Sequence, residues 1–288
     1  MNQIKLFIEL TRLKKPIGFM LLFWPCAWGL TLAYDFSSDL NNYFFYLILF
    51  FLGSVLMRSA GCIVNDILDK DFDSKVFRTK DRPIASRKVS IKLAIFYSIT
   101  LCLLALLVLL NFNSLTIIMA LGSMPLAFTY PLMKRFTYWP QLYLGITFNY
   151  GLILGWTPIN SEIELVPILF YLGAIFWTLG YDTIYGYQDI KDDEIIGLKS
   201  TSIKFKGNPK KFLFICYSLI IILFTIGGYY MNLNSSYYIL GIIPLIHLFF
   251  YQMKNFNHAD PSSCLSVFKS NNIFGLIVLL NILIAKLF

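Results

Sequence analysis

Long apolar runs separated by short polar connections dominate the hydrophobic pattern of this chain. Each run is close to the roughly 20 helical residues that cross a bilayer core of about 30 Å. Backbone groups in lipid must pair within a helix or a closed barrel, and the runs lack the alternation of barrel strands. The pattern predicts a bundle of nine transmembrane helices, at residues 17–34, 43–63, 92–110, 115–133, 139–157, 165–187, 212–231, 237–253 and 271–288.

The composition fits one all-α membrane domain covering residues 1–288. Hydrophobic residues make up 57% of the chain and charged residues 14%, with a mean hydropathy of +0.66. The first run exceeds the apolar core of a typical signal peptide and contains Pro25, so we expect it to remain as a membrane span.

Lysine and arginine are distributed unevenly among the connections. They occur in the N-terminal tail, in the connections 64–91, 188–211 and 254–270, and in the turn at Lys134, whereas the alternate connections contain none. Positive residues near span ends stay in the cytoplasm, so the N-terminus is expected to be cytoplasmic, with Lys286 as the one exception. This asymmetry accounts for the net charge of +8 and leaves no basic patch for a nucleic-acid partner.

Sulfur and imidazole groups are too scattered to indicate disulfides or a metal site. They have no paired spacing and are interpreted as apolar fillers or isolated side chains. These residues are Cys26, Cys62, Cys102, Cys216, Cys264, His247 and His258.

An acidic cluster, "NDILDKDFD" at residues 65–73, follows the second apolar run. In a helix of about 100° per residue, Asn65, Asp69 and Asp73 recur every four residues and face the same side, with Asp66 beside them. Acidic residues contribute little to membrane topology, so the orientation rule does not require them. The stripe therefore indicates a function at the cytoplasmic end of a span.

A second acidic cluster, within "YDTIYGYQDIKDD" at residues 181–193, follows the sixth run. On one helix Asp182 and Asp189 would nearly eclipse each other, with Tyr185 between them and Asp193 one turn further. If the two stripes face each other, at least five carboxylates converge and repel unless divalent cations neutralise them. Oxygen ligands without Cys or His suit Mg²⁺. The simpler alternative is that both clusters are solvated loop residues.

The chain resembles the UbiA superfamily of intramembrane prenyltransferases at these motifs. "NDILDKDFD" matches N-D-x-x-D-x-x-x-D, and "DIKDD" matches D-x-x-x-D. Four stretches resemble the 4-hydroxybenzoate polyprenyltransferase branch: "RLKKPIGFMLLFWPCAWGL" from 12, "TKDRPIAS" from 79, "YPLMKRFTYWPQLYLG" from 130 and "YDTIYGYQDIKDDEIIGLKST" from 181. Two departures are visible, because Arg87 replaces a usual Gly and Gly186-Tyr187 replaces a usual Ala-Met pair.

The resemblance implies transfer of a polyprenyl group from polyprenyl diphosphate to the ring carbon ortho to the hydroxyl of 4-hydroxybenzoate, in ubiquinone biosynthesis. It implies Mg²⁺ as the cofactor. The implied metal ligands are Asn65, Asp66, Asp69, Asp73, Asp189 and Asp193.

The resemblance also implies a basic set around the diphosphate. Arg135 is further expected to grip the acceptor carboxylate two-pronged. Asp189 or a neighbouring carboxylate is expected to assist loss of the ring proton. The residues expected to contact substrate are Arg12, Arg78, Arg82, Lys134, Arg135, Asp182 and Tyr185, and those expected to act in catalysis are Asp69, Asp73, Asp189, Asp193 and Arg135.

Two alternatives stay open. A related enzyme with a naphthoate, haem, homogentisate or chlorophyll-type acceptor would carry the same acidic motifs. A cation-coupled transporter or channel would usually place its ionisable groups near the membrane midplane, on broken helices. The spans, together with the lack of a recognisable transit peptide, lead us to expect a bacterial inner membrane protein with a cytoplasmic active site.

Overall fold

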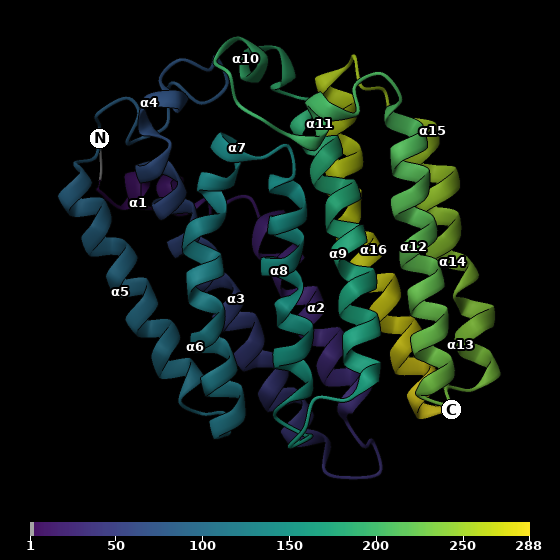
Figure 1. Cartoon of the computed structure of the whole chain (residues 1–288). Coiled ribbons are helices and arrows are strands. Elements are labelled where there is room, and N and C mark those ends of the chain that lie inside the picture. Colours follow the sequence, from purple (N-terminus) through teal and green to yellow (C-terminus); the bar gives the residue numbers. More distant parts are fainter. Residues whose placement is uncertain (1–2) are drawn as a thin grey trace.

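Long helices lie side by side and run the length of the molecule (Figure 1). The computed structural model describes residues 3–288, which contain helices and no strand. The long helices are α2 (Ile17–Ala33), α3 (Leu40–Leu68), α5 (Ile91–Leu109), α6 (Ser114–Thr129), α8 (Pro140–Trp156), α9 (Leu165–Gly186), α12 (Pro209–Tyr230) and α16 (Pro261–Leu287).

Shorter helical pieces connect or extend the long ones. The short pieces are α1 (Gln3–Thr11), α4 (Lys70–Asp73), η1 (Tyr130–Leu132), α7 (Met133–Phe136), α10 (Ile190–Ile195), α11 (Thr201–Lys204), α13 (Ser235–Leu240), α14 (Ile242–Ile246), η2 (His247–Gln252) and α15 (Met253–Asn255). The last four of these form one segment, Ser235–Asn255, in which η2 is a π-helical stretch.

The helical bundle predicted from the apolar runs is confirmed. All nine predicted runs lie in helical segments, and seven segments of residues 3–288 are long and apolar enough to cross a membrane. Two further helices, α2 and α8, have 17 residues each. Helix α16 begins well before the predicted start at 271, because Asp260 accepts a hydrogen bond from the Ser262 N–H and Pro261 occupies the first turn.

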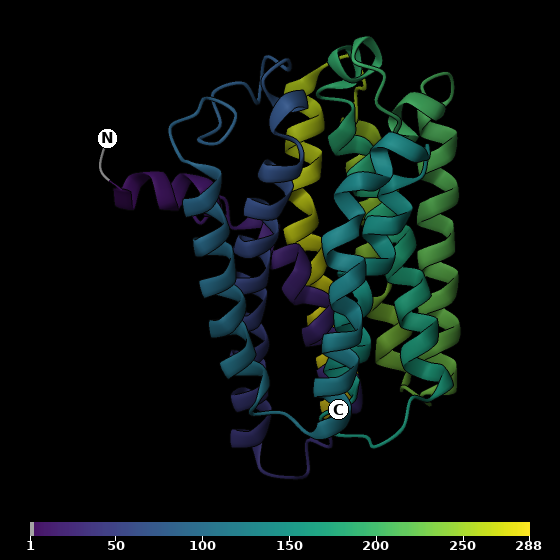
Figure 2. The ribbon, with the colours of Figure 1, turned by 60° about the vertical axis from the view of Figure 1, so that its left-hand side comes forward.

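The connections rich in Lys and Arg gather at one end of the bundle. Figure 1 shows α4, α7, α10 and α11 together at that end, with the C-terminus at the other. Figure 2 shows α1 projecting sideways from the bundle, across the direction of the long helices. The polar motifs that follow the second and sixth spans are thereby brought to a common end.

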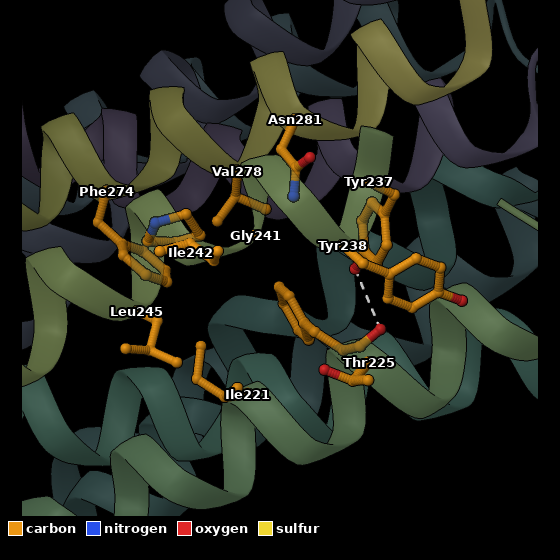
Figure 3. A pocket seen from close by; sticks show the side chains of 12 residues that line it. Ile221, Thr225, Tyr237, Tyr238, Gly241, Ile242, Leu245, Phe274, Val278 and Asn281 are labelled. Atoms are coloured by element: carbon orange, nitrogen blue, oxygen red, sulfur yellow. Dashed lines mark hydrogen bonds between the residues drawn. The ribbon is translucent and has the colours of Figure 1, made fainter. Parts of the chain in front are cut away.

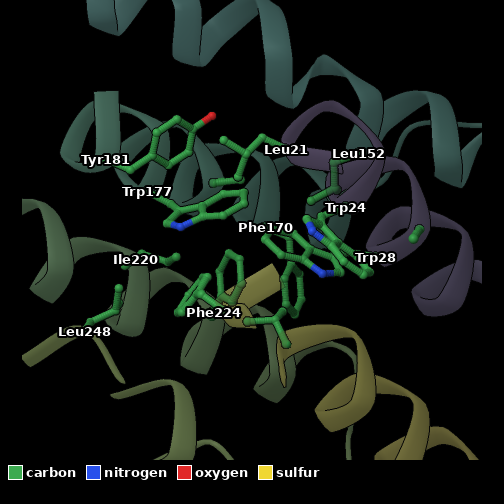
Figure 4. Packing of buried hydrophobic residues seen from close by; sticks show 14 of the residues in the cluster. Leu21, Trp24, Trp28, Leu152, Phe170, Trp177, Tyr181, Ile220, Phe224 and Leu248 are labelled. Carbon is green, nitrogen blue, oxygen red and sulfur yellow. The ribbon is translucent and has the colours of Figure 1, made fainter. Parts of the chain in front are cut away.

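Aromatic side chains fill the centre of the bundle between α2, α9, α12 and α16 (Figure 4). The rings of Trp28 and Trp177 have centroids 5.0 Å apart. Trp28 Nε1 donates to the Gly275 carbonyl at 2.9 Å, so the buried indole N–H is satisfied. Helices α2 and α8 can approach closely because Gly155 has no side chain. A Cβ at this position would lie 2.2 Å from the Cys26 carbonyl oxygen.

Candidate functional site

The first acidic motif lies where α3 passes into α4. The helix changes direction at Asp69, yet the Asp69 N–H donates to the Asn65 carbonyl at 2.9 Å and the Asp73 N–H donates to the Asp69 carbonyl at 2.8 Å. These bonds continue the helical i to i−4 pattern across the kink. Asn65, Asp69 and Asp73 therefore keep the four-residue spacing that predicted a common face.

Two arginines neutralise Asp66 and Asp73. Asp66 is only 2% exposed and pairs with Arg12, whose backbone φ of 56° places it in the left-handed region at the end of α1. Arg82 Nη1 lies 3.2 Å from Asp66 Oδ1 and 2.7 Å from Asp73 Oδ2. Since buried carboxylates are costly unless paired, these arginines are part of what makes the motif stable.

Asp69, 1% exposed, is held mainly by α7. Lys134 Nζ lies 2.6 Å from Asp69 Oδ2, and burial raises the pKa of Asp69 while Lys134 opposes that rise. Arg135 Nη2 lies 3.8 Å from Asp69 Oδ1 and donates to the Leu68 carbonyl at 2.6 Å. The guanidinium of Arg135 also lies over the Phe72 ring, 5.1 Å from its centroid. Arg135 is thus directed to the junction of α3 and α4.

The second acidic motif is split between two helices, which corrects the single helical stripe predicted from the sequence. Helix α9 ends at Gly186, and the Asp189 N–H donates to the Gly186 carbonyl at 3.3 Å in a tight turn before α10. Gly186 lies against α11, since a Cβ there would be 2.4 Å from Ser202 Oγ. Asp182 consequently stays in the span, while Asp189 and Asp193 lie in the end region.

Arg78, in the connection after α4, reaches the second acidic motif. Its Nε donates to Asp189 at 2.7 and 3.0 Å, and its Nη1 donates to the Tyr185 hydroxyl at 3.0 Å. The Phe77 N–H donates to Asp192 Oδ2 at 3.3 Å. Burial, followed by the adjacent carboxylate of Asp189, raises the pKa of Asp193 to about 6.

The expected convergence of five carboxylates on one metal-sized space does not occur within residues 3–288. No group of three or more Asp, Glu, His or Cys side chains in this part of the chain is arranged to hold an ion. Like-charged carboxylates repel, and here basic residues separate them. The donor set nevertheless has the hard-oxygen chemistry of a magnesium site, and Asp69 Oδ1 is enclosed without a hydrogen-bond partner.

A large apolar cavity lies between α2, α3, α5, α6 and α8, and Val64 and Ile67, next to the first acidic motif, line it. Its volume is about 680 Å³. Leu103 on α5 and Leu121 on α6 line the cavity and are also 57% and 49% exposed. Helix α5 packs on α3 but makes little contact with α6, so the cavity opens sideways between α5 and α6.

Arg58 was not among the predicted site residues. It lies in α3, about two turns or 12 Å along the helix from Asp66, and is the one charged side chain among the described residues that line the cavity. Its Nε is enclosed and lacks a hydrogen-bond partner, and its guanidinium lies 5.4 Å from the Phe148 ring centroid. The sequence does contain a signal for Arg58, because it is a lone arginine inside an apolar run. Burying a charged side chain in a membrane costs free energy, so such a residue usually has a function.

The sequence of this chain is similar to those of known proteins. Residues 22–276 match the model of the UbiA prenyltransferase family. A mitochondrial 4-hydroxybenzoate polyprenyltransferase of Homo sapiens is 41% identical over 98% of this chain and 75% of its own length. A protein of the same name from Dictyostelium discoideum is 39% identical over 99% of this chain, which spans 62% of that relative's length.

Solved structures give the same fold. A UbiA homologue from Aeropyrum pernix K1 has a TM-score of 0.77 with 22% identity, covering 93% of this chain and 98% of its own. A homologue from Archaeoglobus fulgidus, bound to GPP and Mg²⁺, has a TM-score of 0.72 with 18% identity, covering 98% and 99%. The chain belongs to the UbiA prenyltransferase family.

Proposed function

We propose that this chain is a 4-hydroxybenzoate polyprenyltransferase. It joins the polyprenyl group of a polyprenyl diphosphate to the ring carbon ortho to the hydroxyl of 4-hydroxybenzoate. One observation carries the proposal: the first acidic motif continues the helix whose Val64 and Ile67 line an apolar cavity, and Arg58 is the one charged side chain among the described residues that line it. Relatives named for this activity, about 40% identical over nearly the whole chain, support the choice of acceptor.

The polar region has the composition needed to hold a diphosphate. Arg12, Arg82, Lys134 and Arg78 supply positive charge within one end region. Each is already paired with a carboxylate, so diphosphate binding would exchange carboxylate oxygens for phosphate oxygens around these cations. Arginine and lysine suit this exchange because both make charge-assisted hydrogen bonds to phosphate.

The carboxylates released by that exchange would be free for Mg²⁺. We assign Asp66, Asp69, Asp73 and Asp189 to this role, together with the carboxylate of Asp193 and the amide oxygen of Asn65, and the unpartnered Asp69 Oδ1 fits it. The Archaeoglobus fulgidus homologue is described as bound to GPP and Mg²⁺. Bound magnesium would supply charge neutralisation for the departing diphosphate.

The protein's own groups account for the rest of the reaction. The allylic carbon–oxygen bond breaks and its electron pair leaves with the diphosphate, which Arg78, Arg82 and Lys134 stabilise. The cavity walls exclude water from the allylic cation, which would otherwise be hydrolysed. The aromatic ring then forms the new carbon–carbon bond and loses its proton to a carboxylate. Asp189 is the candidate from the motif, and Asp182 is the candidate closer to Arg58 along the bundle.

The acceptor carboxylate needs a cation within the cavity. Arg58 lines the cavity and has a free Nε, whereas Arg135 is already directed to Leu68 and Asp69. We therefore assign the carboxylate to Arg58 and keep Arg135 as the rival. The two assignments differ in whether substitution of Arg58 or of Arg135 raises the KM for 4-hydroxybenzoate.

The first test is a transfer assay on membranes, with labelled 4-hydroxybenzoate and a polyprenyl diphosphate, with and without Mg²⁺. Magnesium-dependent labelled lipid is expected from the wild type, and Asp69→Ala should abolish it. Asp71→Ala is the matched control, because Asp71 lies in the same motif but is exposed and outside the acidic stripe. Product only with a naphthoate or haem acceptor would overturn the substrate and keep the reaction class.

The second test separates the two arginines. Arg58→Lys should raise the KM for 4-hydroxybenzoate at least about tenfold, since lysine cannot grip a carboxylate with two parallel hydrogen bonds. The KM for the polyprenyl diphosphate should change much less. If Arg135→Lys alone shows this split, the carboxylate belongs to Arg135.

We further propose that the active site faces the cytoplasm of a bacterium. The apolar helices support a multi-pass membrane protein. Related proteins carry mitochondrial names, so the membrane that holds this chain is tested by fractionation of its source cells. Recovery in mitochondria would replace the bacterial inner membrane.

A further inference from the structure

A second pocket lies on the other side of the aromatic core, between α12, α13, α14 and α16 (Figure 3). Its volume is about 130 Å³. None of its lining residues lines the large cavity. Tyr238 and Ile242 in its wall are 38% and 53% exposed, so the pocket is reached from the bilayer. It is therefore separate from the proposed prenyl-transfer site.

The pocket forms where the segment Ser235–Asn255 is irregular. Pro244 lacks the N–H that would bond the Leu240 carbonyl, and the helix is interrupted at Gly241 between α13 and α14. The irregular segment leaves part of its surface unpacked against these two helices. Space consequently remains beside α12 and α16.

A buried polar side chain lines this space without a hydrogen-bond partner. Asn281 on α16 is 6% exposed, and Figure 3 shows its amide directed into the pocket. Its Oδ1 is enclosed and accepts no hydrogen bond from any described residue. An unsatisfied amide oxygen in a membrane span is costly, so a ligand with a hydroxyl group would relieve that cost.

The remaining walls favour a flat ring. Phe224, Tyr237, Tyr238 and Phe274 present aromatic surfaces, and the Tyr237 hydroxyl is already used in a bond to the Phe224 carbonyl at 3.0 Å. Aromatic walls pack planar rings through stacked or edge contacts. A phenol combines such a ring with a hydroxyl that donates to Asn281 Oδ1 and accepts from its Nδ2.

We propose that this pocket binds the phenolic head group of a membrane-soluble molecule, with Asn281 holding the hydroxyl. The site lies outside the proposed catalytic region, so binding does not require prenyl transfer.

The test uses 4-fluorophenol and 4-fluoroanisole as probes, titrated against the full chain in lipid nanodiscs and followed by fluorine NMR. The two probes share the ring, but the anisole lacks the hydroxyl donor. Empty nanodiscs give the contribution of partition into lipid. Wild-type protein should bind the phenol saturably and about tenfold more tightly than the anisole, the effect of one buried hydrogen bond.

Asn281→Leu should abolish the preference for the phenol, because the apolar side chain keeps the shape and removes the acceptor. Asn111→Leu, an exposed asparagine outside the pocket, should leave it unchanged. Val278→Phe should abolish saturable binding of both probes by filling the space. Equal binding of the probes to wild type, a preference retained in Asn281→Leu, or binding unaffected by Val278→Phe would each overturn the proposal.

Discussion

Arg87 has a backbone φ of 59°, in the left-handed region where a Cβ is strained. Its N–H donates to the Ile84 carbonyl at 3.0 Å, which closes a turn in the connection between α4 and α5. The resemblance noted from the sequence places a glycine here in related chains. The conformation explains that preference, because glycine adopts positive φ freely.

Arg87→Gly should raise the thermal unfolding midpoint of the purified protein. Removing the strain of a left-handed, non-glycine residue stabilises the folded protein by about 1–2 kcal/mol. The greater conformational freedom of glycine in the unfolded chain offsets roughly 0.5–1 kcal/mol of that stabilisation. Arg87→Ala keeps the strain and removes the charge. If alanine raises the midpoint as much as glycine, charge repulsion rather than the backbone limits stability at this position.

The sequence predicted which acidic residues share a helix face, but it did not predict their cationic partners. The acidic stripe at Asn65, Asp69 and Asp73 follows from helical spacing, which the structure retains. The partners of these residues come from positions far along the chain, such as Lys134, so spacing could not give them. Lys286, the exception to the charge pattern, donates to the Leu32 carbonyl at 3.1 Å at the end of α2. That contact explains a lysine at this end of the bundle.

At the scale of elements, the break between α9 and α10 depends on Gly186. A methyl group there would lie 2.4 Å from Ser202 Oγ, and the Ser202 hydroxyl donates to the Thr183 carbonyl at 2.8 Å. The sequence showed that Gly186 replaces the alanine that is usual in related chains, but it did not show the reason for this glycine. Its contact with α11 is formed only in the folded chain.

Gly186→Ala should destabilise the protein by about 1–3 kcal/mol, the usual cost of overpacking. It should also lower transfer activity, because Asp189 lies in the turn that follows. Gly207→Ala is the matched control, since its added methyl would meet nothing within 4 Å. The double variant Gly186→Ala/Ser202→Gly should recover part of the loss in chemical unfolding, and no recovery would place the strain elsewhere.

Helix α7 is attached to the α3–α4 junction by the pair of Lys134 and Asp69. Lys134→Met leaves the buried Asp69 carboxylate without its nearest cation, so we expect a loss of about 3–5 kcal/mol. Lys134→Met/Asp69→Asn should be more stable than Lys134→Met alone, although both variants lose activity. Unfolding by denaturant measures the difference.

The control for this pair is Lys206→Met. Lys206 and Glu194 form an ion pair in which both side chains are largely exposed. Its loss should cost less than about 1 kcal/mol. A double variant no more stable than Lys134→Met would mean that the charge of Asp69 is not the source of the destabilisation.

At the scale of the whole molecule, the helical fold could be predicted because each apolar run must become a helix in lipid. The common end of the two acidic motifs also followed from their place after the second and sixth spans. The resemblance implied an apolar cavity open to lipid, but the helices that form it and its opening between α5 and α6 could not be predicted, since they depend on how helices pack. Arg58 was missed for the same reason, because its place in the cavity wall is a property of packing.

Arg78 pairs with Asp189 of the second acidic motif, and Asp66, Asp69 and Asp73 of the first motif are each held by a cation. This arrangement predicts that magnesium and the donor stabilise the protein together. Magnesium alone must displace a bound arginine or lysine, and a diphosphate alone must approach buried carboxylates, so each alone should shift the unfolding midpoint little.

Together, magnesium and an unreactive prenyl thiodiphosphate should raise the midpoint by several degrees, because a ligand at 100 times its Kd stabilises by about 2.7 kcal/mol. Asp69→Asn should lose the joint effect, whereas Asp71→Asn should keep it. A full shift with magnesium alone would mean that the carboxylates already form a metal site. Calorimetry in detergent measures all of these shifts without any turnover, so the outcome tests the exchange of ion pairs independently of the acceptor.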